Sequence, residues 1–343
     1  MRSHRVATDR LEVQLVESGP EDGIPVVLIH GNLSTGRFFE HLFDGAPSRY
    51  RLLAPDMRGF GDTERVPLDA TRGLRDWADD TAGLLDALGI TRAPHLVGWS
   101  TGGAAIAAFA LERPVASLTF IDPVGPYGYG ATKLDGTPHY DDFAGSGGGT
   151  GNPEFTARLA AGDTSSDGDT APRNVLNSSY WNPAHREPPE REEMLLGELL
   201  KSVTGDDGYP GDTSTSEHWP GVAPGTRGIL NALSPKYCNW AALVDLDPKP
   251  PVLWTHGAQD IVVADGSPWE MGTLGQLGAI PGWPGADVFP PQPMVAQIRA
   301  VLERYAAAGG RVETEWFEES GHFPPLDSPE RFNARFFGFL ESL

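Results

Sequence analysis

The amino-acid sequence predicts an α/β protein in which a mostly parallel sheet is flanked by helices and one large insertion interrupts the chain. Short apolar segments rich in Val, Ile and Leu alternate with segments of helical periodicity. This alternation stops after Asp122 and resumes at Val252. A length of 343 residues suits one such domain that carries an insertion.

The apolar segments are the candidate strands. Near-continuous apolar runs of roughly four to seven residues are typical of parallel strands that helices cover on both faces. Such runs fall at residues 12–16, 26–30, 52–54, 95–99, 115–121 and 252–256. A further segment, residues 312–317, has the composition of an edge strand.

Helical periodicity separates these strands. The clearest helix ends before Gly89, a residue type that suits a helix C-terminus, and its stripe consists of Leu74, Trp77, Thr81, Leu84, Leu85 and Leu88. Further helices are expected at residues 104–111, along the apolar stripe from Met294 to Tyr305, and from about Ser328-Pro329 onward.

Residues 123–248 are rich in Gly, Pro, Asp and Ser, with only short helical candidates such as 192–203. An interruption of this length is too long for a plain loop, so we interpret it as an inserted cap between two core segments, 1–122 and 249–343. Residues 263–291, which contain two tryptophans and several prolines, predict a second, smaller irregular insert.

Charge and composition exclude several classes of protein. The formal charge of -21 opposes binding to nucleic acid and to anionic membrane surfaces, and a single cysteine excludes a disulfide scaffold. The first twenty residues lack a signal-peptide-like apolar run, and no segment approaches the roughly 20 apolar residues of a membrane span. We expect a soluble cytoplasmic protein, for which a homo-oligomer is compatible with the sequence.

The most informative motif is the G-x-S-x-G sequence at residues 98–102, between candidate strand 95–99 and candidate helix 104–111. A serine in this motif lies on a sharp, strained strand-to-helix turn, and small residues two positions on either side let strand and helix approach closely. The turn presents the hydroxyl at a helix N-terminus, which favours negative charge. We predict that Ser100 is a nucleophile; the alternative is a serine that only caps the helix.

A serine nucleophile needs a general base, and the base needs an acid that fixes its tautomer. For this type of turn the partners follow in the order serine, acid, histidine. Asp260 follows strand 252–256 and His322 follows strand 312–317, so both lie on loops after strand ends. We predict Asp260 as the acid and His322 as the base, with Asp122 as the rival acid.

The negative charge of a tetrahedral intermediate needs two convergent N–H donors. The backbone N–H of Thr101, directly after the nucleophile, is one candidate, and that of Asn32, on the loop after strand 26–30, is the other. The amide side chain of Asn32 could add a further donor.

Aromatic residues of the predicted cap could line an apolar substrate pocket. The main candidates are Tyr180, Trp181, Trp219 and Trp240, with Tyr127, Tyr129 and Phe155 as further members of this group. For each of them the alternative is a place in the core of the cap itself.

Five motifs resemble those of the α/β-hydrolase superfamily: His30-Gly31-Asn32, residues 56–62, residues 98–102, residues 257–260 and Gly321-His322. They span the chain apart from its inserts. The resemblance implies a mostly parallel sheet flanked by helices, with the insertion forming a cap over the site.

Differences from the motifs of related families narrow the branch of the superfamily that this chain resembles. Haloalkane dehalogenases and epoxide hydrolases have aspartate where this chain has Ser100, and proline iminopeptidases have GGSWG and HGGPG motifs that are absent here. GWSTGG together with HGN looks more like the carboxylesterase, lactonase and cofactor-free haloperoxidase branch.

The resemblance therefore implies a serine hydrolase that cleaves a small neutral or apolar ester or lactone through an acyl-enzyme, without metal or organic cofactor. The alternatives on the same triad are a carbon-carbon or amide hydrolase and a cofactor-free haloperoxidase or perhydrolase. A non-catalytic binding protein on this fold is a further alternative.

Overall fold

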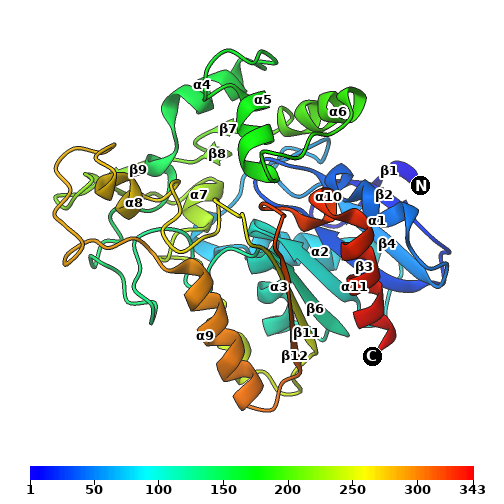
Figure 1. Ribbon diagram of the computed structural model, residues 1–343. Helices are drawn as coiled ribbons and strands as arrows, with labels where there is room; N and C mark the ends of the chain where they lie inside the picture. Colours follow the sequence, from blue (N-terminus) through cyan, green and yellow to red (C-terminus); the bar gives the residue numbers. More distant parts are fainter.

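The computed structural model describes all 343 residues and contains an eight-stranded sheet of order β1-β2-β4-β3-β5-β6-β11-β12 (Figure 1). Its strands are β1 (Arg2–Ala7), β2 (Glu12–Ser18), β3 (Ile24–Ile29), β4 (Tyr50–Pro55), β5 (His95–Trp99), β6 (Ser117–Ile121), β11 (Val252–Gly257) and β12 (Val312–Phe317). β2 pairs antiparallel with β1 and β4, and all other pairs are parallel. The predicted mostly parallel sheet is confirmed.

β1 is a strand that the apolar pattern did not predict. Its side chains are mostly exposed or half-buried, because it lies at the edge of the sheet and pairs only with β2. The buried strands β3, β5 and β11 show the continuous apolar character that the sequence analysis used. An exposed edge strand has no such signature.

The direction of each crossover determines which face of the sheet a helix covers. α1 (Glu40–Asp44) connects β3 to β4, its neighbour on the side of β1. The helices that connect a strand to one lying further toward β12 are α2 (Arg75–Ala87), α3 (Thr101–Glu112) and α9 (Met294–Ala307). Because parallel crossovers are right-handed, α1 covers one face and the other three helices cover the opposite face. α11 (Pro329–Glu341) packs against α1.

The insertion between β6 and β11 contains short elements around irregular segments and lies above the sheet in Figure 1. They are η3 (Gly148–Thr150), α4 (Pro153–Ala160), α5 (Pro172–Val175), η4 (Leu176–Tyr180), α6 (Pro189–Leu199), β7 (Thr204–Gly205), β8 (Tyr209–Pro210), β9 (Thr213–Thr215), β10 (Val222–Pro224), α7 (Ile229–Ala232) and η5 (Ala241–Asp245). α6 begins three residues before the expected helix because a proline occupies its first turn. The final element, η5, packs against α3 and α9.

The second insert, residues 263–291, contains α8 (Met271–Gln276) and packs against the first insertion rather than against the sheet. Met271 and Phe289 form a small buried cluster with Ala131, and Trp219 packs on it. Two segments far apart in the sequence therefore build one structure beside the carboxyl ends of the strands. None of the helices combines the length and apolar character that a bilayer crossing requires.

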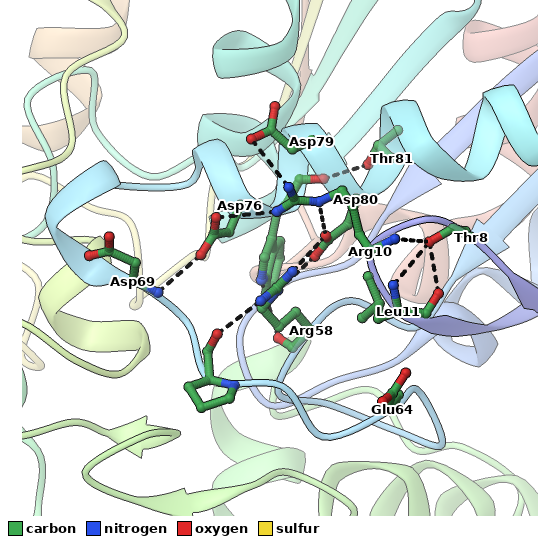
Figure 2. Close-up of polar contacts among 12 residues, drawn as sticks. Thr8, Arg10, Leu11, Arg58, Glu64, Asp69, Asp76, Asp79, Asp80 and Thr81 are labelled. Atoms are coloured by element: carbon green, nitrogen blue, oxygen red, sulfur yellow. Dashed lines mark hydrogen bonds and ion pairs between the residues drawn. The ribbon is translucent and has the colours of Figure 1, made fainter.

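A buried ion-pair network holds the turn after β4 against α2 (Figure 2). The Arg58 guanidinium donates from Nε and Nη2 to the two carboxylate oxygens of Asp80, each at 2.8 Å, and from Nη1 to the carbonyl of Pro67. Arg10 donates from Nε to the same Asp80 carboxylate at 2.7 Å. The Trp77 indole N–H donates to the carbonyl of Arg58, so this network also fixes the turn that packs beside His30.

Candidate active site

Ser100 lies on the sharp turn between β5 and α3 that its motif predicted. Its backbone has φ 53° and ψ -116°, a left-handed conformation that is strained for a residue with a side chain. A Cβ atom on Gly98 would lie 2.3 Å from the carbonyl oxygen of Gly102, and one on Gly102 would lie 2.2 Å from that of Ile29. Only glycine at both positions permits this close approach of strand and helix.

His322 and Asp260 form a buried hydrogen-bonded pair. Nδ1 of His322 donates to Oδ2 of Asp260 at 2.8 Å, and Oδ1 of Asp260 accepts the backbone N–H groups of Val262 and Val263 at 2.7 and 3.1 Å. Burial alone would raise the pKa of Asp260, but the charge and hydrogen bond of His322 hold it below its ordinary value. Asp260 is therefore ionised and fixes the tautomer of His322.

Ser100 and His322 line the same cavity, but no hydrogen bond joins the Ser100 hydroxyl to the imidazole. Catalytic hydrogen bonds often tighten only when substrate is bound. The Trp99 indole N–H donates to the carbonyl of His322 at 2.7 Å and so fixes the loop of the base against the strand of the nucleophile.

Asp122, the rival acid, makes no hydrogen bond with His322. It is fully buried, and one carboxyl oxygen accepts the N–H of Gly257 at 2.8 Å while the other has no partner. Burial and the charge of nearby Asp260 raise the pKa of Asp122 well above its usual range. Because Asp260 and not Asp122 contacts His322, the contacts favour Asp260 as the acid. The ligand atoms of Asp122, Asp260 and His322 lie within 4.8 Å of one another, and this group contains the proposed base and acid.

The loop after β3 packs directly against the nucleophile. A Cβ atom on Gly31 would lie 3.2 Å from Cβ of Ser100, so glycine permits the close approach. The N–H of Met57 donates to Nε2 of His30 at 2.8 Å, which places the ring proton on Nδ1. Burial lowers the pKa of His30 to about 4, so the ring is neutral.

The same hydrogen bonds orient the predicted oxyanion donor. Nδ1–H of His30 and the hydroxyl of Ser34 donate to the carbonyl of Gly31 at 2.7 and 2.9 Å. Because C=O and N–H point in opposite directions across a trans peptide, the N–H of Asn32 points away from these two donors. It takes part in no hydrogen bond, and Thr101 begins α3, where its N–H has no partner within the helix. Both groups remain available to a ligand.

A cavity of about 390 Å³ opens at Ser100, and more than half of the residues that line it are apolar. It contacts the oxyanion loop at Asn32 and Leu33 and the base at His322. Its remaining walls come from both inserts, so the sheet supplies the reactive groups and the inserts shape the space around them.

Of the four main candidates for substrate binding, only Tyr180 lines this cavity. The expectation is corrected for the three tryptophans, which are packing residues. Trp240 stacks on Phe120, Trp219 packs edge-to-face on Phe289, and Trp181 is buried in the main core. Large aromatic side chains gain most by complete burial, and that effect dominates here.

Several lining residues were missed by the sequence analysis: Val175, Tyr209, Leu230, Leu233, Val262, Pro268, Trp269 and Leu274. They lie in irregular segments or very short helices, where no hydrophobic period marks the buried face. Tyr129 and Phe155, named as further candidates, do line the cavity, whereas Tyr127 does not. The contribution of the second insert, through Trp269 and Leu274, had no signal in the sequence.

The lining includes no lysine and no arginine. Asp169, exposed to solvent, is the only lining carboxylate. A substrate carboxylate buried in this cavity would therefore lack a cationic partner, and an unpaired buried charge is strongly unfavourable.

Comparison with known families agrees with this architecture. The model of the Alpha/beta hydrolase family matches residues 26–335, so the chain belongs to this family. An esterase from Rhodococcus sp. ECU1013 has a similar structure, with a TM-score of 0.59 and 20% sequence identity over 100% of both chains. At 20% sequence identity, this similarity shows that the two proteins share a fold.

Two relatives are similar over a shorter segment. The 2-hydroxy-6-oxo-6-phenylhexa-2,4-dienoate hydrolase of Burkholderia cepacia is 36% identical over 120 residues, which is 34% of this chain and 41% of that protein. The 2-hydroxy-6-oxo-2,4-heptadienoate hydrolase of Pseudomonas putida is 39% identical over 108 residues, 30% of this chain and 38% of that protein. The matched segment thus spans about two fifths of each relative.

Proposed function

We propose that this protein is a serine hydrolase that cleaves neutral carboxylic esters or lactones through an acyl-enzyme intermediate. The observation that carries the proposal is the Ser100, His322 and Asp260 arrangement at an apolar cavity without a cation. The esterase of similar structure supports it at the level of the fold. The insertion is proposed to act as a cap that selects the substrate.

In the first half-reaction, Ser100 Oγ forms a bond to the ester carbonyl carbon while its proton moves to Nε2 of His322. The N–H groups of Asn32 and Thr101 stabilise the oxyanion. The tetrahedral intermediate collapses by breaking the bond to the leaving alkoxide, which takes the proton from His322. Water then attacks the acyl carbon with the same base, and release of the acid regenerates Ser100.

A carbon-carbon hydrolase is the second candidate, because two relatives are hydrolases of 2-hydroxy-6-oxo-dienoates. The same serine can attack a ketone carbonyl, with a carbanion equivalent as leaving group. Substrates of that kind carry a carboxylate, however, and the cavity offers it no lysine or arginine. This difference favours the neutral ester.

The test is turnover of p-nitrophenyl acetate, butyrate and octanoate at mildly alkaline pH, beside hydrolysis of a 2-hydroxy-6-oxo-dienoate. Ser100→Ala and His322→Ala, matched for folding by circular dichroism, serve as controls. Ester turnover that both variants lose supports the proposal. Turnover of the dienoate alone would replace it by the carbon-carbon reaction, and the absence of any turnover and of Ser100 labelling by a fluorophosphonate would refute both.

A further inference from the structure

The side chain of Tyr180 connects the insertion to the oxyanion loop. Tyr180 is the last residue of η4 and is 8% exposed. Its hydroxyl lies 3.1 Å from the carbonyl oxygen of Asn32 and 3.0 Å from that of Leu33. The hydroxyl carries one proton, which the two carbonyls share, and neither carbonyl accepts another hydrogen bond. The ring lies edge-to-face against Trp99, beside the nucleophile, with a centroid separation of 5.6 Å.

The segment that Tyr180 contacts is strained and has few other hydrogen bonds. Leu33 has φ 52°, a left-handed conformation that residues with side chains rarely adopt. On the N-terminal side, the carbonyl of Gly31 is fixed by His30 and Ser34. On the C-terminal side, the peptides of Asn32 and Leu33 are fixed through their carbonyls by Tyr180. The orientation of the predicted oxyanion N–H depends on both sets of bonds.

The residues directly after Tyr180 also contact the loop of the base. The N–H of Asn182 donates to Oδ1 of Asp327 at 3.0 Å, and Oδ2 of Asp327 accepts the N–H of Gly321, next to His322, at 2.6 Å. The side-chain amide of Asn182 donates to the carbonyl of Glu319 at 2.7 Å. Residues 180–182 of the insertion thus connect the oxyanion loop to the loop of the general base.

We propose that Tyr180 is a positioning residue whose hydroxyl fixes the oxyanion loop, so that docking of the insertion completes the oxyanion hole. The inference rests on the proposed serine-hydrolase function. It assigns Tyr180 a role beyond lining the cavity: the residue acts through the backbone of Asn32 and Leu33 and supports the transition state more than the bound substrate.

The test is Tyr180→Phe, which removes the hydroxyl and keeps the ring. We expect kcat on p-nitrophenyl butyrate to fall at least roughly tenfold, less than the roughly 10²- to 10³-fold cost of deleting an oxyanion donor, while KM changes by less than about twofold. Affinity for a trifluoromethyl ketone, which mimics the tetrahedral intermediate, should fall in the same proportion. The backbone amide NMR signals of residues 31–34 should broaden, because the loop loses its single fixed conformation.

Tyr305→Phe is the matched control, because the Tyr305 hydroxyl also donates to a buried carbonyl, that of Pro250, but lies outside the cavity. It should leave kcat and ketone affinity unchanged. Unchanged kcat in Tyr180→Phe, or a rise in KM alone, would overturn the proposal. The NMR measurement needs no substrate. If the wild type hydrolyses no ester, the proposed function fails, whereas wild-type amide signals of residues 31–34 in Tyr180→Phe refute the positioning role itself.

Discussion

Nδ1 of His322 lies 2.8 Å from Oδ2 of Asp260, and the other oxygen of the same carboxylate accepts two backbone N–H groups. Asp260 is therefore held by three hydrogen bonds in one orientation. A carboxylate in this position can only accept from Nδ1, so Nε2 of His322 stays free to accept a proton. Asp122 is nearby, but its carboxyl accepts the N–H of Gly257 at the end of β11 and does not contact His322.

The two carboxyl groups should respond very differently to amide substitution. We expect Asp260→Asn to lower kcat by about 10⁴-fold, because the amide stabilises the wrong tautomer of the histidine. Asp122→Asn should cost less than about tenfold, since Asp122 does not contact His322. Steady-state kinetics with p-nitrophenyl butyrate measure both variants. A larger loss in Asp122→Asn would make Asp122 the acid.

The close packing of the loop after β3 on Ser100 predicts that a side chain at Gly31 disturbs the site. In Gly31→Ala the added Cβ would lie 3.2 Å from Cβ of Ser100 and from the Trp99 ring, which forces the loop or the serine to move. A shift of this kind should lower kcat by up to roughly 10²-fold. Gly338→Ala is the control, because its Cβ would meet nothing within 4 Å. Equal activities of the two variants would contradict the described packing.

The composition of the cavity predicts discrimination by substrate charge. A p-nitrophenyl ester whose acyl chain ends in a carboxylate should have a kcat/KM at least roughly 10²-fold below that of the uncharged ester of equal length, because the buried charge would lack a partner. Leu233→Arg places a cation in the lining and should reduce the difference. Equal rates for both esters in the wild type would show that the acyl chain binds outside this cavity.

The buried ion pair between Arg58 and Asp80 should matter for stability. Arg58→Met leaves the buried Asp80 carboxylate paired only with the partly exposed Arg10, so it should lower the free energy of unfolding by roughly 1.5–3 kcal/mol in urea titrations. Arg227→Met is the comparison, because Arg227 is 46% exposed in its pairs with Asp206 and Asp207, and it should change stability by less than about 1 kcal/mol. Similar losses in both variants would mean that burial of the network contributes little.

The central sheet, and the positions of the candidate reactive residues in it, could be predicted from the sequence because each follows a local rule. Buried parallel strands such as β5 read as continuous apolar runs, and glycines at 98 and 102 are demanded by the close contact around Ser100. The position of Asp260 and His322 after successive strand ends follows from the topology, because parallel strands bring their carboxyl ends to one edge.

The cavity walls could not be predicted because they depend on contacts between distant irregular segments. Trp219 and Trp269 are both tryptophans in Pro- and Gly-rich stretches, yet one packs on Phe289 and the other lines the cavity. No periodicity separates these two outcomes. The role of Tyr180 likewise depends on a hydrogen bond to residues about 150 positions away in the chain, which follows only from the docked insertion.

Protonation of His95 should destabilise the fold in acid. His95 is buried at the start of β5, and its Nδ1 lies 2.8 Å from the hydroxyl of Ser117 in a hydrogen bond. Burial, with a smaller contribution from the charge of Arg92, lowers its pKa from 6.5 to about 4. The unfolded chain therefore binds more protons between these values, and stability falls as pH falls from 6.5 toward 4. His95 alone should account for about 2 kcal/mol of lost stability between pH 7.5 and 5.0.

His95→Gln removes this titration while keeping a polar side chain beside Ser117. Asp56, whose pKa burial raises to about 6, titrates in the same range with the opposite sign, but both proteins share it and it cancels in the difference. Urea titrations at the two pH values measure the change in unfolding free energy for each protein. We expect the wild type to lose about 2 kcal/mol more than His95→Gln, whereas parallel losses would show that His95 becomes protonated without unfolding.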